Sequence, residues 1–175
     1  MIRGFFLFTA IIFSCCSSNN NKKIIKNSNS VSRINVPVFN EDSAYFFIQE
    51  QVDFGPRFLS SPGWEKCSFY LENKLKTYTK NVFVQEARTK TYDNKKHTLK
   101  NIIASFSPEK NNRIALMAHW DTRHIADHDT INQNQPILGA NDGGSGVAVL
   151  LELARSFNLQ KPNIGIDIIL FDAED

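Results

Sequence analysis

The sequence IGIDIILFDAED, at residues 164–175, decides the fold class because a nearly continuous apolar run ends abruptly in acidic residues. A run of this kind is typical of an apolar strand. A second run, RIALMAHWDTR at residues 113–123, has the same order of apolar and then polar residues, and its continuously apolar part at 114–118 is typical of a strand that is covered on both faces. Residues 146–157, between the two runs, have the pattern of a buried helix. This order predicts a βαβ crossover in an α/β domain with a mixed, mainly parallel sheet and helices on both faces.

The residues that precede these runs extend the α/β pattern. Asn40 and Ser61-Pro62 are typical helix starts, and they predict one helix at 41–52 and another from residue 62. Residues 81–91 and 101–107 have the composition of strands.

The composition excludes some classes of protein. Of the 175 residues, 42% are hydrophobic and 22% are charged, as in an ordinary globular chain. The net charge is only +2, from 20 basic and 18 acidic residues. Nucleic-acid-binding proteins concentrate positive charge, so we do not expect nucleic acid as a partner.

The first residues indicate export from the cytoplasm. Residues 1–14 hold one charge and a short apolar run, which is typical of a signal peptide, and the residues up to Cys15 resemble a bacterial lipobox. The alternative is an apolar helix of the fold. Residues 15–36 are rich in Asn, Ser and Lys and predict a flexible tether before a domain at 37–175. We therefore expect a lipoprotein of the cell envelope, in the periplasm or at the outer membrane, anchored to the membrane by lipid on Cys15.

Polar residues with metal-binding chemistry follow the predicted strands. His119 and Asp121 follow the first apolar run, Asp142 lies in a glycine-rich turn, and Glu174-Asp175 follow the last run. Ligands bind outside the carboxyl ends of strands in such sheets, so we expect these residues at one rim. Histidine beside carboxylates suits zinc-assisted chemistry on an amide. The alternatives are that Asp142 only caps a helix and that Glu174-Asp175 is an ordinary polar strand end.

These motifs resemble the zinc aminopeptidase superfamily, whose members carry co-catalytic metals. Within it, QVDFGPR at 51–57, AHWDTR at 118–123 and LFDAED at 170–175 resemble the bacterial lipoprotein form of glutaminyl-peptide cyclotransferases (glutaminyl cyclases). The resemblance covers residues 40–175, with the motifs in the family's order.

The resemblance implies a role for each site residue. Asp142 and Asp175 match carboxylate ligands of zinc, and Glu174 matches the general acid/base. His119 matches the ligand of a second zinc ion in the aminopeptidases and lies behind the ligands in the one-zinc cyclases. Asp121 is then expected to hold His119 in one tautomer.

The resemblance implies a zinc-dependent acyltransferase that converts N-terminal Gln of peptides or proteins to pyroglutamate and releases ammonia. A zinc aminopeptidase of the same fold is the first alternative, and a non-catalytic envelope lipoprotein is the second. The family takes a further His ligand from later in its chains. We therefore expect a catalytic domain truncated at its C-terminal side, inactive and poorly stable as a 175-residue chain.

Overall fold

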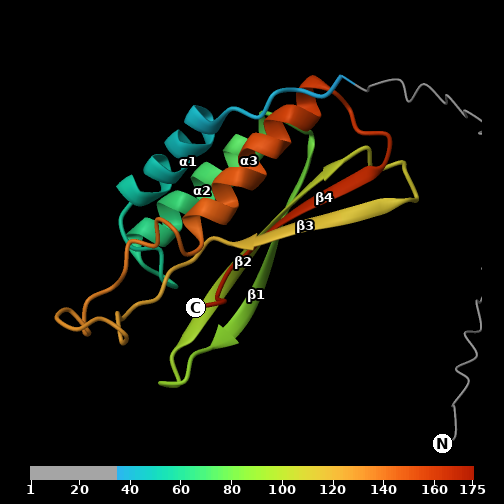
Figure 1. Cartoon of the computed structure of the whole chain (residues 1–175). Helices are drawn as coiled ribbons and strands as arrows, with labels where there is room; N and C mark the ends of the chain where they lie inside the picture. Colours follow the sequence, from blue (N-terminus) through green and yellow to red (C-terminus); the bar gives the residue numbers. More distant parts are fainter. Residues whose placement is uncertain (1–34) are drawn as a thin grey trace, which may run out of the picture. The chain divides into compact units, whose positions relative to one another are not determined.

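The structure is a computed structural model that describes residues 35–175 (Figure 1). The predicted signal peptide, Cys15 and the tether up to residue 34 lie outside the described residues. In chain order the elements are α1 (Glu41–Asp53), α2 (Pro62–Lys76), β1 (Asn81–Lys90), β2 (Lys96–Phe106), β3 (Arg113–His119), α3 (Gly144–Leu159) and β4 (Gly165–Phe171).

The first two helices begin where their caps predict. The side chain of Asn40 accepts a hydrogen bond from the backbone N–H of Ser43 at the start of α1. Ser61 does the same for the N–H of Trp64 in α2, and Pro62 occupies a position whose N–H has no helical partner. Both caps are confirmed.

The four strands form one sheet in the order β1-β2-β4-β3. The predicted α/β class with a mixed sheet is confirmed. The prediction that the sheet is mainly parallel is wrong for the described strands. β1 pairs with β2 and β2 with β4 in antiparallel fashion, and only β3 and β4 are parallel. The link between β1 and β2 is a short hairpin, which forces the antiparallel arrangement.

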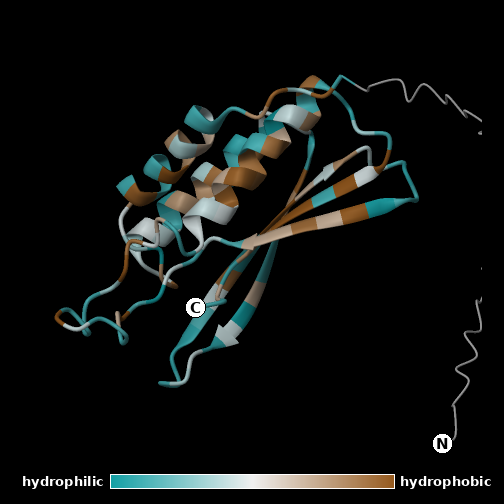
Figure 2. Ribbon diagram, viewed as in Figure 1, coloured by the Kyte–Doolittle hydropathy of each residue, from teal (hydrophilic) through white to brown (hydrophobic). Residues whose placement is uncertain are grey.

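The core lies between the sheet and the three described helices, which are all on one side of it (Figure 1). The expectation of helices on both faces is therefore wrong for the described residues. The buried side chains of β2 and β4 alternate along each strand and face α2 and α3, and Figure 2 shows the hydrophobic residues along α3 and β3. The fully buried members include Leu71, Ile102, Leu151, Ile168 and Leu170. The apolar face of a helix layer therefore covers one face of the sheet.

The expectation that β3 is covered on both faces is wrong for the described part of the chain. Ile114 is 45% exposed and Met117 is 58% exposed. β3 is an edge strand of the described sheet, and its side that carries Leu116 and Ala118 packs against the core. Met117 is on the opposite side, away from the described helices, whereas Ile114 shares the core-facing side and is exposed near the start of the strand. A continuous apolar run does not reveal which face a neighbouring element covers. Among residues 35–175, none of the helices combines the length and hydrophobicity that a membrane crossing requires.

Candidate metal centre

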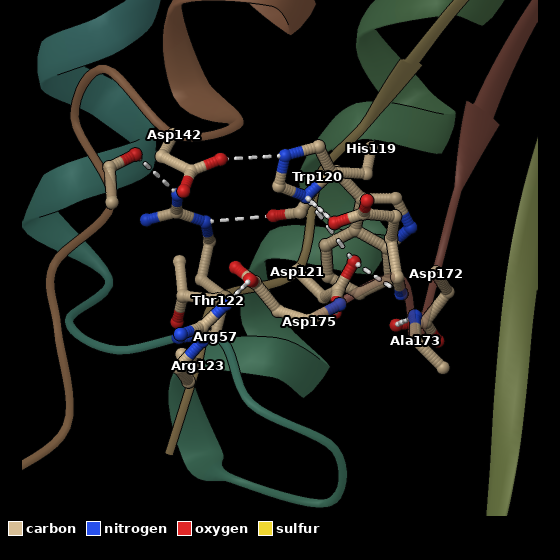
Figure 3. Close-up of polar contacts among 12 residues, drawn as sticks. Arg57, His119, Trp120, Asp121, Thr122, Arg123, Asp142, Asp172, Ala173 and Asp175 are labelled. Carbon is tan, nitrogen blue, oxygen red and sulfur yellow. Dashed lines mark hydrogen bonds and ion pairs between the residues drawn. The ribbon is translucent and has the colours of Figure 1, made fainter. Parts of the chain in front are cut away.

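Three segments meet at the carboxyl end of the β3–β4 pair. His119 is the last residue of β3 and lies opposite Phe171, the last residue of β4, so the residues after both strands are neighbours. One possible ligand atom from each of His119, Glu174 and Asp175 lies within 4.8 Å of the others. Asp142 reaches the same place from the turn before α3, where its Oδ1 lies 2.8 Å from Nε2 of His119 (Figure 3). The expected meeting of the three segments is therefore confirmed.

The two nitrogens of the His119 ring face different carboxylates. Nε2 faces Asp142, whereas Nδ1 lies 3.6 Å from Asp121 and 3.8 Å from Glu174. Both of the latter separations are too long for a hydrogen bond, and buried Nδ1 has no hydrogen-bond partner among the described residues. The role of Asp121 in fixing the tautomer of His119 stays a prediction.

Asp121 has another contact that the sequence did not suggest. Its buried carboxylate accepts the backbone N–H of Glu174 at 3.3 Å and that of Asp175 at 3.1 Å. Burial raises the pKa of Asp121, and these two hydrogen bonds act in the opposite direction. The carboxylate therefore holds the backbone from which two of the predicted site residues project.

Asp142 does not cap α3. The N-cap position of this helix is Gly143, and no side chain bonds there. The side chain of Asp142 is 61% exposed and contacts His119. A Cβ atom at Gly143 would lie 2.2 Å from the carbonyl oxygen of His119, so only glycine permits the turn to approach β3 this closely. The turn thus directs Asp142 toward the site.

Asp175 is a nearly buried carboxylate that is incompletely satisfied. Its side chain is only 4% exposed, and its Oδ1 is 3.3 Å from Arg123, which also pairs with Asp127. Its Oδ2 has no hydrogen-bond partner in the described part of the protein. A buried carboxylate oxygen without a partner is costly, and a bound cation would remove that cost.

The donor set fits zinc. Two buried atoms without partners, His119 Nδ1 and Asp175 Oδ2, belong to residues that lie together, and both are atom types that zinc binds. Asp142 approaches the other ring nitrogen of His119. Glu174 lies beside these donors with its side chain largely exposed, as a proton-transfer group must be.

Sequence reasoning missed Asp172, the residue directly after β4. Its buried carboxylate accepts hydrogen bonds from the indole N–H of Trp64 and from the backbone N–H groups of Lys100 and Ala173. Burial raises the pKa of Asp172 to about 6. The signal in the sequence is an acidic residue directly after an apolar strand. That signal was assigned to Glu174 and Asp175 and not to Asp172.

Comparisons with known proteins agree with this fold. Residues 101–175 match the model of peptidase family M28. The glutaminyl cyclase of Bacteroides thetaiotaomicron, solved with N-acetylhistamine, is 51% identical over 81% of this chain and 49% of its own, with a TM-score of 0.78. The Tannerella forsythia glutaminyl cyclase is 50% identical over 79% of this chain and 48% of its own, with a TM-score of 0.78. A Zn-dependent exopeptidase from Parabacteroides distasonis is 48% identical over 81% of this chain and 49% of its own, with a TM-score of 0.78.

The fold and these matches define the class: the chain has the zinc aminopeptidase-like fold, with an M28 match over residues 101–175. Within that class, it is similar to bacterial glutaminyl cyclases. It spans about half the length of the solved structures that it matches.

Proposed function

We propose that the chain carries the reaction centre of a zinc-dependent glutaminyl-peptide cyclotransferase. The observation that carries this proposal is the grouping of His119, Glu174 and Asp175, in which Oδ2 of Asp175 is buried without a hydrogen-bond partner among the described residues. The identity of about 50% to two bacterial glutaminyl cyclases supports this activity over others of the class. The substrates are peptides or proteins with an N-terminal Gln.

The carboxylates of Asp142 and Asp175 would hold the zinc ion, with the ring of His119 near both. Zinc bound there supplies a Lewis acid that polarises the side-chain amide carbonyl of the substrate. The cyclases of this class use one zinc ion, whereas the aminopeptidases use two. His119 would be a zinc ligand only in an aminopeptidase.

Glu174 would carry out both proton transfers. Its carboxylate takes a proton from the α-amine as the amine nitrogen attacks the amide carbon, which closes the five-membered ring. It then returns the proton to the departing nitrogen, so the products are pyroglutamate and ammonia. The backbone bond from Glu174 to Asp121 holds this residue beside the metal donors.

A zinc aminopeptidase is the second candidate because two structures of similar identity are a Zn-dependent exopeptidase and a leucine aminopeptidase precursor. The same carboxylate of Glu174 would then take a proton from an attacking water molecule. The product would be a free amino acid. A non-catalytic envelope lipoprotein remains the third candidate.

The test uses a chimera because the chain spans about half the length of these enzymes. Residues 35–175 are joined to the part of the B. thetaiotaomicron enzyme that they do not match, and the product from Gln-Phe is identified. Pyroglutamyl-Phe with ammonia supports the cyclotransferase. Free Gln with Phe supports the aminopeptidase, and neither product, with zinc stoichiometry near zero, supports the non-catalytic protein. The 175-residue chain, which we expect to be inactive, is assayed in parallel.

We also propose that the protein is a lipoprotein of the cell envelope, anchored through Cys15. The support is the sequence of the first 36 residues alone. Cys15→Ser is expected to move the protein from the membrane fraction to the soluble fraction. An unchanged membrane fraction would contradict the anchor.

A further inference from the structure

The guanidinium of Arg57 is buried, and all of its hydrogen bonds go to backbone carbonyl groups. It is 0% exposed, and it forms no ion pair with any residue in 35–175. Burial lowers the pKa of Arg57, and the nearby charge of Asp121 acts in the opposite direction. Burying a charge without a carboxylate partner is costly, and hydrogen bonds to the guanidinium offset part of that cost. The backbone segments that supply these bonds are therefore held together by Arg57.

The guanidinium connects the two segments that supply His119 and Asp142. Its Nε donates to the carbonyl of Trp120 at 3.0 Å, one residue after His119 (Figure 3). Its Nη2 donates to the carbonyl of Gly139 at 2.9 Å, at the start of the turn that carries Asp142. Nη1 donates to the preceding carbonyl, that of Leu138, at 2.8 Å.

Hydrogen bonds to the Gly139 carbonyl fix both ends of the turn that carries Asp142, at Gly139 and at Gly144. The carbonyl of Gly139 accepts the Arg57 bond and also the N–H of Gly144, the first residue of α3, at 3.1 Å. Gly139 has a φ of +59°, and a Cβ atom there would lie 2.3 Å from the Thr122 methyl group. The turn therefore packs directly against the segment after β3, with Arg57 between the two backbones.

We propose that Arg57 is a positioning residue for the metal centre, and that its guanidinium sets the separation between the His119 ring and the Asp142 carboxylate. This inference rests on the proposed function only in taking Asp142 as a zinc ligand with the His119 ring beside it. The contact of 2.8 Å between His119 Nε2 and Asp142 Oδ1 is the separation that Arg57 would maintain. Arg57 touches neither side chain; it acts through the backbone on each side.

The experiment compares Arg57→Met and Arg57→Lys with Leu75→Ala in the 175-residue chain. Met keeps most of the apolar stem but donates no hydrogen bond, whereas Lys keeps the charge and can reach one carbonyl. Leu75 is fully buried in α2 and is the control for a general loss of stability. The readouts are hydrogen exchange of the amides at 138–144 and the dissociation constant of zinc chloride by calorimetry.

Arg57→Met is expected to speed exchange in residues 138–144 selectively and to weaken zinc binding about 10- to 100-fold, as loss of a group that orients ligands commonly does. Arg57→Lys is expected to recover part of the zinc affinity and to remain measurable if Arg57→Met does not fold. Leu75→Ala should lower the unfolding temperature without selective exchange in the turn.

The inference is overturned if Arg57→Lys and any folded Arg57→Met protein keep zinc affinity and turn exchange within about twofold of the parent, well short of the usual loss. It is equally overturned if both change only as they do in Leu75→Ala. If neither the parent chain nor the chimera binds zinc, the proposed function fails, and the exchange of residues 138–144 still decides whether Arg57 holds the turn.

Discussion

At the amino-terminal end of the β3–β4 pair, Arg113 donates to both carboxylate oxygens of Asp167, and Ser105 donates to the same carboxylate. At the carboxyl end of the same pair, Asp175 has one bond of 3.3 Å to Arg123 and an oxygen without a partner among the described residues. The two ends thus carry similar charged groups, but the carboxylate of Asp175 is only partly satisfied, whereas that of Asp167 has a partner for each oxygen.

The pKa values differ in the same sense. The hydrogen bonds of Arg113 lower the pKa of Asp167, so its charged form is favoured in the fold. Burial raises the pKa values of Asp121 and Asp172 at the other end, so their charged forms are disfavoured. A satisfied charge pair contributes to stability, whereas buried polar groups left unsatisfied indicate a place where the protein binds something else. The amino-terminal end is structural, and the carboxyl end holds the candidate metal centre.

The largest expected effect is on catalysis at the carboxyl end. Glu174→Gln in the chimera should lower turnover of Gln-Phe by about 100-fold or more, because an amide cannot accept the proton of the α-amine. Steady-state rates of pyroglutamate formation measure this effect. Glu109→Gln, an exposed site distant in sequence from the centre, is the matched control and should keep the parent rate. A Glu174→Gln protein that retains more than a tenth of the parent rate would remove this residue from the mechanism.

The next largest expected effect is on the free energy of unfolding, which should differ between variants at the two ends of the β3–β4 pair. Asp167→Asn leaves Arg113 without its charged partner and should lower the free energy of unfolding by about 1–3 kcal/mol. Asp175→Asn removes a charge that is already poorly satisfied, and we expect a change within about 0.5 kcal/mol or a gain. Urea unfolding of the 175-residue chain in metal-free buffer measures both. Equal losses in the two variants would show that Asp175 is a structural residue.

Local patterns predicted most of the elements and the place where the site residues meet. Asn40 and Ser61 are caps that act within one turn, so the sequence alone locates them. β2 begins at Lys96, before the predicted residue 101, because its polar first half pairs with β1. Cross-strand pairing of polar residues leaves no hydrophobic signal in a single strand.

The parts of the site that could not be predicted depend on contacts between distant segments. The bonds of Arg57 to the segments around residues 120 and 139 are visible only after folding, and the motif at 51–57 gave a resemblance but no contact. The same holds for Asp121, whose carboxylate binds a backbone more than 50 residues later in the chain. Residue type and spacing indicate donors of a metal site, but they do not reveal which groups hold those donors in position.

Zinc should act on one end only. A ligand that binds the folded state stabilises it by RT ln(1 + [L]/Kd), or about 1.4 kcal/mol at ten times the Kd. Zinc chloride should therefore raise the unfolding temperature of the parent chain and of Asp167→Asn, and chelator should reverse the shift. Asp175→Asn should show little or none of it. A shift of equal size in Asp175→Asn, measured by differential scanning fluorimetry, would place the bound zinc elsewhere.

The smallest expected effect is a pH dependence of opposite sign at the two ends. Asp172 has a pKa of about 6 in the fold because it is buried, above that of an unfolded chain, so the folded state binds its proton more tightly. Its contribution to stability is complete at low pH and is lost as pH rises through about 6. Lowering the pH from 7 to 5 should therefore add about 1 kcal/mol to the free energy of unfolding.

Asp167 has a lowered pKa, so its contribution to stability is lost as pH falls below the usual range of an aspartate. Urea unfolding at pH 7, 6, 5 and 4 should show the gain between pH 7 and 5 disappear in Asp172→Asn and persist in Asp167→Asn. The same slope in all three proteins would mean that burial of Asp172 does not set the response of the carboxyl end.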